Sequence, residues 1–326
     1  MREPLPLCMR AAIIAAPRTM ELCEVLVPVP GPEEVLIRVE GCGVCGSSLP
    51  VWEGRPWFPY PRPPGTPGHE GWGTVAAVGA RVTAVAPGAR VGFLSERAFA
   101  EYDVAPATSL VLLPAGLRHR DMPAEALGCA MNIWRRSGIE AGQTVAVVGV
   151  GFLGALLVQL AARAGARAIA ISQRAASLEV ARRMGAAETI ELLADDTAIV
   201  ARAWRLTGGA GCDRVLELTG AQRPLDLAAK LCRVRGRLVI AGFHQDGPRQ
   251  IDMFLWNWRG LDVINAHERA PEAYVTGMAA ALDRMSSGQL DPQPLYTHRV
   301  PLARADEAFE LLRQRPDGFV KALVIP

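Results

Sequence analysis

The chain has 326 residues, which is long for a single hydrophobic core and about right for two domains. Half of the residues are hydrophobic and 21% are charged, a composition typical of a folded globular protein. The formal net charge is only +2, and the positive charge comes almost entirely from arginines that are scattered along the chain. Because no basic stripe or run is present, we expect no nucleic-acid partner.

No stretch of the sequence approaches the length of a membrane span, so we expect no membrane partner. The apolar run near the amino terminus, residues 11–16, is bounded by Arg10 and Pro17 and is too short for the core of a secretory signal. The interpretation is a cytoplasmic protein, whose thiols stay reduced. Its seven cysteines are odd in number and widely spaced, which is not the pattern of a disulfide framework.

The first part of the chain is rich in β-strand signals. Residues 35–39 and 73–78 are runs of strand-forming residues, and Pro-Gly and Pro-Ala-Gly breaks at 87–88 and 114–116 interrupt the pattern. Residues 55–67 combine several prolines with aromatic residues, which predicts a stiff loop.

From about Glu125 the pattern changes to alternating helices and strands, which predicts an α/β fold with a doubly wound parallel sheet. The predicted elements are helices over residues 126–137, 152–164 and 176–184, and strands over residues 144–148, 168–172, 214–218 and 237–241. Beyond about residue 266 the pattern reverts to a helix over 272–286, an extended piece over 296–300, and a closing helix and strand.

The simplest architecture is a Rossmann domain inserted into a discontinuous, mostly β domain. The predicted bounds are residues 125–265 for the Rossmann domain, and residues 1–124 and 266–326 for the β domain.

A glycine-rich turn follows the first strand of the alternating region. Gly149, Gly151 and Gly154 form a Gly-x-Gly-x-x-Gly turn between a buried strand and a helix. The first glycine allows the tight turn, the second lets the backbone reach a pyrophosphate, and the third permits close helix packing. The helix amino terminus adds partial positive charge, so the pattern favours a dinucleotide site over a merely structural turn. The predicted cofactor contacts are Gly149, Gly151, Phe152, Leu153, Gly154, Ser172, Arg174 and Thr219.

The end of the second strand bears on which dinucleotide is bound. An NAD site places a carboxylate there for the ribose diol, but this chain has Ser172, Gln173 and Arg174, and no acid before Glu179. Arg174 can pair with a 2′-phosphate, so we favour NADP(H) over NAD(H). The alternative is that Arg174 is simply a solvated residue before a helix.

Two further motifs precede the alternating region. Residues 41–48 read Gly-Cys-Gly-Val-Cys-Gly-Ser-Ser, and residues 68–73 read Gly-His-Glu-Gly-Trp-Gly. With a Rossmann unit downstream, they resemble the medium-chain, zinc-dependent alcohol dehydrogenase family, whose catalytic domain carries a Cys-Gly-(Ser/Thr)-Asp segment and a Gly-His-Glu segment. The resemblance covers nearly the whole chain, from Met9 to Lys321, and implies that the β domain is GroES-like.

Three further segments fit the polyol, or sorbitol-type, branch of that family best. They are residues 52–55, which read Trp-Glu-Gly-Arg, residues 125–130, which read Glu-Ala-Leu-Gly-Cys-Ala, and residues 296–302, which read Tyr-Thr-His-Arg-Val-Pro-Leu.

The resemblance implies a metal site with one catalytic zinc ion per subunit. Cys45 and His69 would be zinc ligands, since thiolate and imidazole suit zinc. Glu70 and Glu125 fall where this branch places carboxylates, and we expect one to bind zinc directly and the other through water. Cys129 is an alternative third ligand, because alcohol-oxidising relatives use a cysteine in this region.

The candidate catalytic residues are Ser47 and Glu70. Ser47 matches the family's hydroxyl that passes the substrate proton toward the cofactor ribose, and the alternative is a serine that only shapes a turn. Zinc suits this chemistry because it lowers the pKa of a bound oxygen to about 7.

One cysteine pair allows other interpretations, and two residues differ from the pattern of the family. Cys42 and Cys45 form a Cys-x-x-Cys pair, which raises a redox or structural-zinc interpretation, but no second pair exists. The family's aspartate after the hydroxyl residue is Ser48 here, which removes a carboxylate from the surroundings of the metal. Pro50 stands where many relatives have a relay histidine, so the proton must leave by ribose and water.

The remaining histidines carry weaker signals. His119 and His244 are interpreted as surface or turn residues, and His298 as structural. His267 and Glu268 follow the last predicted Rossmann strand, where relatives contribute residues to the substrate pocket.

The sequence therefore predicts hydride transfer between a secondary alcohol of polyol, sugar or cyclitol type, or its ketone, and a nicotinamide cofactor. A metal-free quinone or enone reductase of the same superfamily and a non-catalytic dinucleotide-binding protein are the alternatives. Family resemblance also suggests a homodimer or homotetramer joined through Rossmann edge strands.

Overall fold

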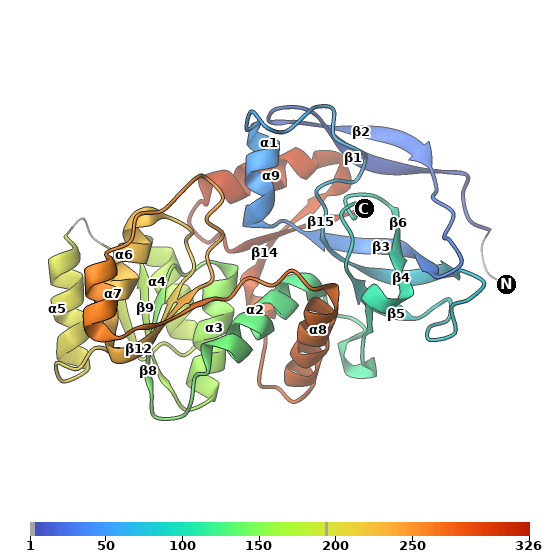
Figure 1. The fold of residues 1–326 in the computed structure, drawn as a ribbon. Coiled ribbons are helices and arrows are strands. Elements are labelled where there is room, and N and C mark those ends of the chain that lie inside the picture. The colour runs from blue at the N-terminus through green and yellow to red at the C-terminus, as the bar shows by residue number, and fades with distance from the viewer. Residues whose placement is uncertain (1–3, 193–194) are drawn as a thin grey trace. The chain divides into compact units, whose positions relative to one another are not determined.

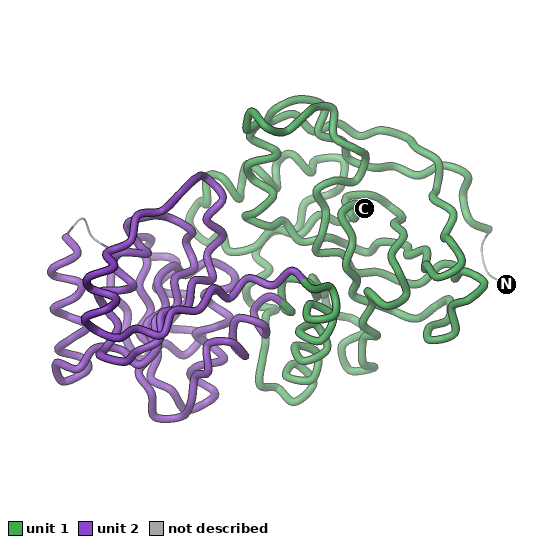
Figure 2. The backbone as a smooth tube through the Cα atoms, in the orientation of Figure 1, with its two compact units in different colours: residues 1–128, 270–326 green, residues 129–269 purple. Residues whose placement is uncertain are grey.

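The computed structural model describes residues 4–192 and 195–326 (Figure 1). The chain divides into two compact units (Figure 2). Unit 1 comprises the described residues up to Gly128 together with Ala270–Pro326, and unit 2 comprises Cys129–Arg269. Both boundaries fall a few residues later in the chain than the sequence analysis placed them.

Unit 1 contains two sheets. An antiparallel pair is formed by β1 (Cys8–Ala16) and β2 (Thr19–Leu26). The larger sheet has the order β14-β15-β3-β4-β5-β7, and β6 also pairs with β3. Its strands are β3 (Glu34–Gly43), β4 (Glu70–Val78), β5 (Arg90–Phe93), β6 (Tyr102–Pro106), β7 (Leu110–Leu112), β14 (Tyr296–Pro301) and β15 (Lys321–Ile325).

The α-helices of unit 1 range from 5 residues in α1 to 16 in α8, and α2 continues from unit 1 into unit 2. The α-helices are α1 (Leu49–Glu53), α2 (Ala124–Ser137), α8 (Pro271–Ser286) and α9 (Ala305–Gln314). Single 3-10 turns are η1 (Gly46–Ser48), η2 (Ala107–Ser109), η3 (Ala115–Leu117), η4 (Gln293–Leu295) and η5 (Leu302–Arg304).

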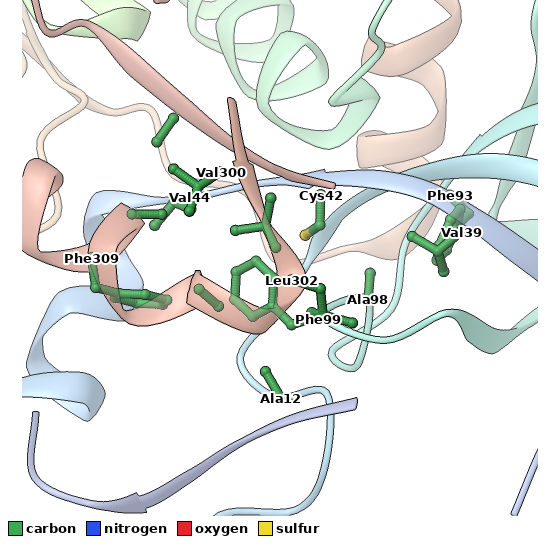
Figure 3. Close-up of a cluster of buried hydrophobic side chains, with 14 of the residues drawn as sticks. Ala12, Val39, Cys42, Val44, Phe93, Ala98, Phe99, Val300, Leu302 and Phe309 are labelled. Carbon is green, nitrogen blue, oxygen red and sulfur yellow. The ribbon is translucent and has the colours of Figure 1, made fainter. Parts of the chain in front are cut away.

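The core of unit 1 forms where the large sheet meets α1 and α9. Phe309 of α9 stacks on Trp52 at 5.7 Å between ring centroids and meets the edge of Phe99 at the same distance. Figure 3 shows Phe99, Phe309 and Cys42 within this cluster of apolar side chains. These buried rings share their core with Val39 and Cys42 of β3, whose carboxyl end leads directly into the segment that carries Cys45.

Unit 2 is a six-stranded parallel sheet in the order β10-β9-β8-β11-β12-β13, surrounded by helices (Figure 1). Its strands are β8 (Thr144–Val148), β9 (Arg167–Ser172), β10 (Glu188–Glu191), β11 (Cys212–Glu217), β12 (Cys232–Ile240) and β13 (Asp262–Asn265). Its helices are α3 (Phe152–Arg163), α4 (Ala175–Arg183), α5 (Asp196–Leu206), α6 (Gln222–Leu231) and α7 (Met253–Arg259). The strand order reverses at β8, as in a doubly wound fold, so the predicted fold class is confirmed.

All seven cysteines lie within the described residues, and each is a free thiol. None of the helices within residues 4–192 and 195–326 is both long and apolar enough to cross a membrane.

Candidate metal centre and dinucleotide site

The pairing of β3 with β4 brings together the two motifs of the predicted metal site. Gly43, at the end of β3, pairs with Glu70, at the start of β4. Cys45 follows β3 by two residues, and His69 immediately precedes β4. As a result, one ligand atom from each of Cys45, His69 and Glu70 lies within 4.8 Å of the other two.

His69 has a defined orientation. Its Nδ1 lies 3.0 Å from the carbonyl oxygen of Pro67, and because a carbonyl only accepts hydrogen bonds, Nδ1 carries the proton. In the neutral imidazole, which is the form that binds a metal, the other ring nitrogen then keeps its lone pair. A metal-binding histidine has this arrangement, since it donates its second ring nitrogen to a carbonyl or carboxylate.

The negative charge around His69 also favours a cation at this position. Burial, the largest influence, lowers the pKa of His69, whereas the hydrogen bond with Cys45 and the negative charge at its sulfur raise it. Glu125 and Glu70 act in the same direction, and the pKa of His69 is held well above its ordinary value. The electrostatics and the donor types both fit a zinc ion.

Glu70 has a partner that the sequence analysis did not predict. Lys321 Nζ lies 2.6 Å from Glu70 Oε1 and 2.5 Å from Oε2, and both side chains are buried. Burial lowers the pKa of Lys321, but the surrounding negative charges, with Glu70 the largest contributor, together outweigh burial and the pKa is raised. Gly43 leaves room for the pair, because a Cβ there would lie 1.9 Å from Glu70 Oε2. A signal was present, since Lys321 begins an otherwise apolar strand and is one of only two lysines in the chain.

The two serines after Cys45 lie against the metal site. Ser47 Oγ donates to Cys45 Sγ over 3.2 Å, which places the predicted catalytic hydroxyl beside the sulfur of Cys45. Ser48 is buried, and its Oγ lies 3.5 Å from the Pro67 carbonyl that also accepts from His69. Ser48 therefore supports the same carbonyl without adding a carboxylate to the site.

Glu125 and Cys129, the two candidates for completing the metal shell, both lie on α2 and are half-buried. Neither belongs to the group of ligand atoms within 4.8 Å. The charge of Glu125 nevertheless raises the pKa values of His69 and Lys321, so the carboxylate acts on the site electrostatically.

Cys42 does not have the surroundings of a redox cysteine. It is 1% exposed, and its thiol donates to the carbonyl of Gly43 over 3.4 Å. Burial, followed by the charge of Glu70, raises the pKa of the Cys42 thiol well above its ordinary value. A buried thiol of high pKa is a poor nucleophile, which argues against the Cys-x-x-Cys redox interpretation.

The glycine-rich turn of unit 2 has the predicted backbone conformation. Gly149 has a φ of +100°, and a Cβ on Gly154 would lie 2.2 Å from the carbonyl oxygen of Gly149. A Cβ on Gly151 would meet no atom within 4 Å, so the backbone is open there. Gly151 is the N-cap of α3 and makes no side-chain cap hydrogen bond, which leaves the amide groups of the first helical turn for an anion.

The remaining predicted cofactor residues lie at the same edge of the sheet. Ser172 ends β9 and is buried, and Arg174 is the half-buried N-cap of α4. Phe152 and Leu153 form the first turn of α3, with Phe152 buried and Leu153 half-buried. Thr219 follows β11, and its Cγ2 lies 2.7 Å from where a Cβ on Gly149 would be.

His244 lies in the loop after β12, as a turn residue would, but its side chain is mostly buried and not at the surface. Its Nε2 lies 3.0 Å from Oε2 of Glu217, a fully buried carboxylate that the sequence analysis did not identify. His267, one of the candidate substrate-facing residues, is exposed, and its Nε2 lies 3.2 Å from the carbonyl of Gly242. Glu268 is half-buried, and its carboxylate accepts from the neighbouring Arg269 amide.

The other two histidines have few contacts. His119 is exposed, and His298 packs on Phe319 at 5.4 Å between ring centroids, in line with its structural interpretation.

Comparison with known proteins gives consistent matches to both units. A family model described as zinc-binding dehydrogenase matches residues 153–283, and one described as alcohol dehydrogenase GroES-like domain matches residues 31–115. The L-threonine 3-dehydrogenase of Bacillus licheniformis is 30% identical, over 92% of this chain and 94% of the relative. The sorbitol dehydrogenase of Gallus gallus is 29% identical, over 88% of each chain. A crystal structure from Sinorhizobium meliloti, described as a zinc-binding dehydrogenase bound to NADP, has a TM-score of 0.85 and 29% identity and covers 98% of this chain and 99% of its own.

Proposed function

Because the chain belongs to the medium-chain, zinc-type alcohol dehydrogenase family, on its sorbitol-like branch, we propose that it is a zinc-dependent dehydrogenase of secondary alcohols. The reaction would transfer a hydride between such an alcohol, or the matching ketone, and a nicotinamide cofactor. One observation carries the zinc part of the proposal, namely that the ligand atoms of Cys45, His69 and Glu70 lie within 4.8 Å of one another.

Cys45 and His69 would hold the metal directly. The hydrogen bond from His69 Nδ1 to the Pro67 carbonyl fixes the ring for this role. Lys321 holds Glu70 at the edge of the site, and Glu125 adds negative charge, so one of these carboxylates would complete the shell directly and the other through water. A bound zinc ion supplies Lewis acidity, which makes a hydroxyl more acidic and a carbonyl more electrophilic.

Ser47 would move the proton. Its hydroxyl already lies 3.2 Å from Cys45 Sγ, so it can accept the proton that the substrate hydroxyl loses. Pro50 carries no ionisable group, and the proton would therefore pass from Ser47 to the cofactor ribose and to water.

The zinc assignment is tested by metal analysis and by substitution. Purified protein is expected to hold one zinc ion per chain, and Cys45→Ser and His69→Gln are each expected to lose both the metal and alcohol oxidation. Cys42→Ala is the matched control in the same segment, and it is expected to keep both because Cys42 points into the core. Activity that persists after chelation would instead favour the metal-free quinone or enone reductase.

The substrate class rests on the relatives and on the carboxylates near the metal site. The names sorbitol dehydrogenase and L-threonine 3-dehydrogenase denote dehydrogenation of hydroxyl-bearing small molecules. We propose polyols, sugars or cyclitols as substrates. Fast turnover of simple alcohols or aldehydes with none on a polyol and sugar panel would contradict this class. Cofactor binding without turnover of any alcohol in the presence of zinc would favour a non-catalytic protein.

We propose NADP(H) as the preferred cofactor. The absence of a carboxylate at the end of β9 and the position of Arg174 at the start of α4 support it, as does the NADP-bound relative. Arg174→Gln is expected to reduce kcat/KM with NADPH about tenfold and to leave kcat/KM with NADH nearly unchanged. Arg183→Gln, at the other end of α4, is the control. A wild-type protein that strongly prefers NADH would refute the assignment.

Two further properties are proposals of the same kind. The protein would act in the cytoplasm, and it would assemble as a homodimer or homotetramer through the edge of the unit 2 sheet.

A further inference from the structure

A fully buried carboxylate lies at the end of β11, on the edge of the sheet where the dinucleotide would bind. Glu217 has an exposure of 0%. Its Oε1 accepts from the amide of Thr219 at 2.6 Å, from the hydroxyl of Thr219 at 2.5 Å and from the amide of Gly220 at 3.0 Å. This one oxygen therefore sets the conformation of the turn that follows the strand.

The second oxygen of Glu217 fixes the tautomer of a histidine. Oε2 lies 3.0 Å from His244 Nε2, and Arg249 Nε lies 2.8 Å from His244 Nδ1. A guanidinium only donates hydrogen bonds, so His244 Nδ1 accepts and the ring proton is on Nε2, where it is donated to Glu217. His244 is thus a neutral imidazole between a carboxylate and a guanidinium.

Arg249 closes the network into a ring. Its Nη2 donates to the carbonyl of Gly220 at 2.7 Å, so Glu217 holds the amide of Gly220 while Arg249 holds the carbonyl of the same residue. A Cβ on Gly242 would lie 2.2 Å from the amide nitrogen of Gly220 and 2.7 Å from Glu217 Oε2. The segment after β12 is therefore clamped onto the turn after β11, with no space for a side chain between them.

The clamp touches the glycine-rich turn. Thr219, whose amide and hydroxyl are held by Glu217, places its methyl group against Gly149, where a Cβ would lie 2.7 Å away. In a doubly wound sheet the dinucleotide lies across the strand ends, with one mononucleotide on each side of the point where the strand order reverses. The strand order reverses at β8, so by this rule β8, β9 and β10 would form the adenosine side, and β11, β12 and β13 the nicotinamide side.

We propose that Glu217, His244 and Arg249 form a clamp that positions the nicotinamide half of the dinucleotide site, with Glu217 as the central positioning residue. The proposal rests on the proposed function for the identity of the cofactor. The clamp residues follow β11 and β12, so we expect the clamp to govern affinity for the nicotinamide mononucleotide half more than for the adenosine half.

Glu217→Gln tests the proposal with almost no change in size. The amide group of glutamine would face a donor whichever way it is turned, either His244 Nε2–H or the amides of Thr219 and Gly220, so one side of the clamp is lost. We expect the Kd for NADPH to rise about tenfold or more, and the Kd for adenosine 2′,5′-bisphosphate, which occupies only the adenosine half, to change less than about twofold. NADH and AMP form the corresponding pair if the wild type prefers NAD(H).

Arg249→Gln provides the second variant. Arg249 lies on a loop, and its replacement keeps the buried carboxylate of Glu217. This variant therefore tests the clamp even if Glu217→Gln does not fold. It is expected to show the same selective loss, smaller in size. Asp213→Asn is the matched control, because Asp213 lies at the opposite end of β11, where it accepts from the Thr144 amide at 2.8 Å and from Arg233 at 2.7 Å.

The tautomer gives a readout that a loss of stability alone would not change. In ¹⁵N-histidine NMR spectra of the wild type, His244 is expected to be protonated at Nε2 only, and this pattern is expected to change in both clamp variants. Equal weakening of both halves of the cofactor, or unchanged NADPH binding by a folded Glu217→Gln protein, would overturn the clamp. A wild-type protein that binds neither dinucleotide would overturn the proposed function as well.

Discussion

Asp103 is a buried carboxyl group that we expect to make stability depend on pH. It lies on β6 and is 5% exposed. Burial raises its pKa from 3.8 to about 6, although hydrogen bonds from Ser95 and from the Val104 amide and the charge of Arg97 act in the opposite direction. Because the folded pKa lies above the unfolded one, the folded state binds this proton more tightly. This contribution to stability is present below about pH 4 and is lost as the pH rises to about 6.

Asp103→Asn is therefore expected to stabilise the protein at neutral pH. Asparagine stays uncharged and can still accept from the Val104 amide, which the aspartate accepts at 2.8 Å. We expect a gain on the order of 2 kcal/mol at pH 7 that shrinks toward zero by pH 4, measured by urea unfolding across this range.

Asp317→Asn serves as the control for that measurement, because Asp317 is exposed. Its free energy of unfolding is expected to stay close to that of the wild type at every pH. An Asp103→Asn protein that is less stable than the wild type at pH 7 would show that the buried charge is better solvated than its surroundings indicate.

The residues of the site were predictable where the motif is local. Cys45 and His69 each lie within a short, distinctive segment, so sequence alone could nominate them. Lys321 could not be placed beside Glu70 in this way, because the two are 251 residues apart and meet only through the pairing of β15 with β3 and of β3 with β4. Glu217 and His244 were missed for a related reason, since their contact depends on the strand order of the sheet.

At the scale of elements, two glycines at the junction of β8 and α3 have different expected roles. Gly154 is needed for close packing of the helix, and Gly151 for close approach of the dinucleotide. Gly154→Ala would place a Cβ 2.2 Å from the carbonyl of Gly149, so we expect a loss of about 1–3 kcal/mol in stability together with weaker dinucleotide binding. Gly151→Ala meets no atom within 4 Å, so we expect unchanged stability but about tenfold weaker binding. Thermal unfolding and titration with NADPH distinguish the two variants, and equal behaviour in both assays would contradict the assigned roles.

Buried strands were predicted from the sequence more accurately than exposed ones. The strands β8 and β9 are buried along almost their whole length, and they were predicted within a residue or so. The edge strands β10 and β13 were missed, because an edge strand is partly exposed and its short sequence lacks a continuous apolar run. The helices α5, α6 and α7 were also missed, although Asp195 and Asp252 were available as N-cap signals for α5 and α7.

At the scale of the whole molecule, one edge of unit 2 has the features of an interface between copies. Within residues 4–192 and 195–326, β13 pairs with β12 and with no other strand, which leaves its outer edge open. The preceding helix α7 exposes Phe254 and Trp258 by 74% and 77%, and their rings stack at 6.0 Å. An open strand edge beside exposed aromatic side chains is a surface that a second copy can cover by extending the sheet about a two-fold axis.

The double substitution Phe254→Glu and Trp258→Glu is expected to separate the subunits. Two carboxylates per chain would have to be desolvated in the same contact, and like charges would face each other across the two-fold axis. Size-exclusion chromatography with light scattering should give a dimer or tetramer mass for the wild type and the mass of one chain for the variant. Trp57→Glu replaces a tryptophan on unit 1 that is 60% exposed, so it makes the same kind of change in surface charge and hydrophobicity outside unit 2 and should keep the wild-type mass. If the wild type already has the mass of one chain, the edge of β13 does not pair with a second copy. The proposed homodimer or homotetramer would then be wrong.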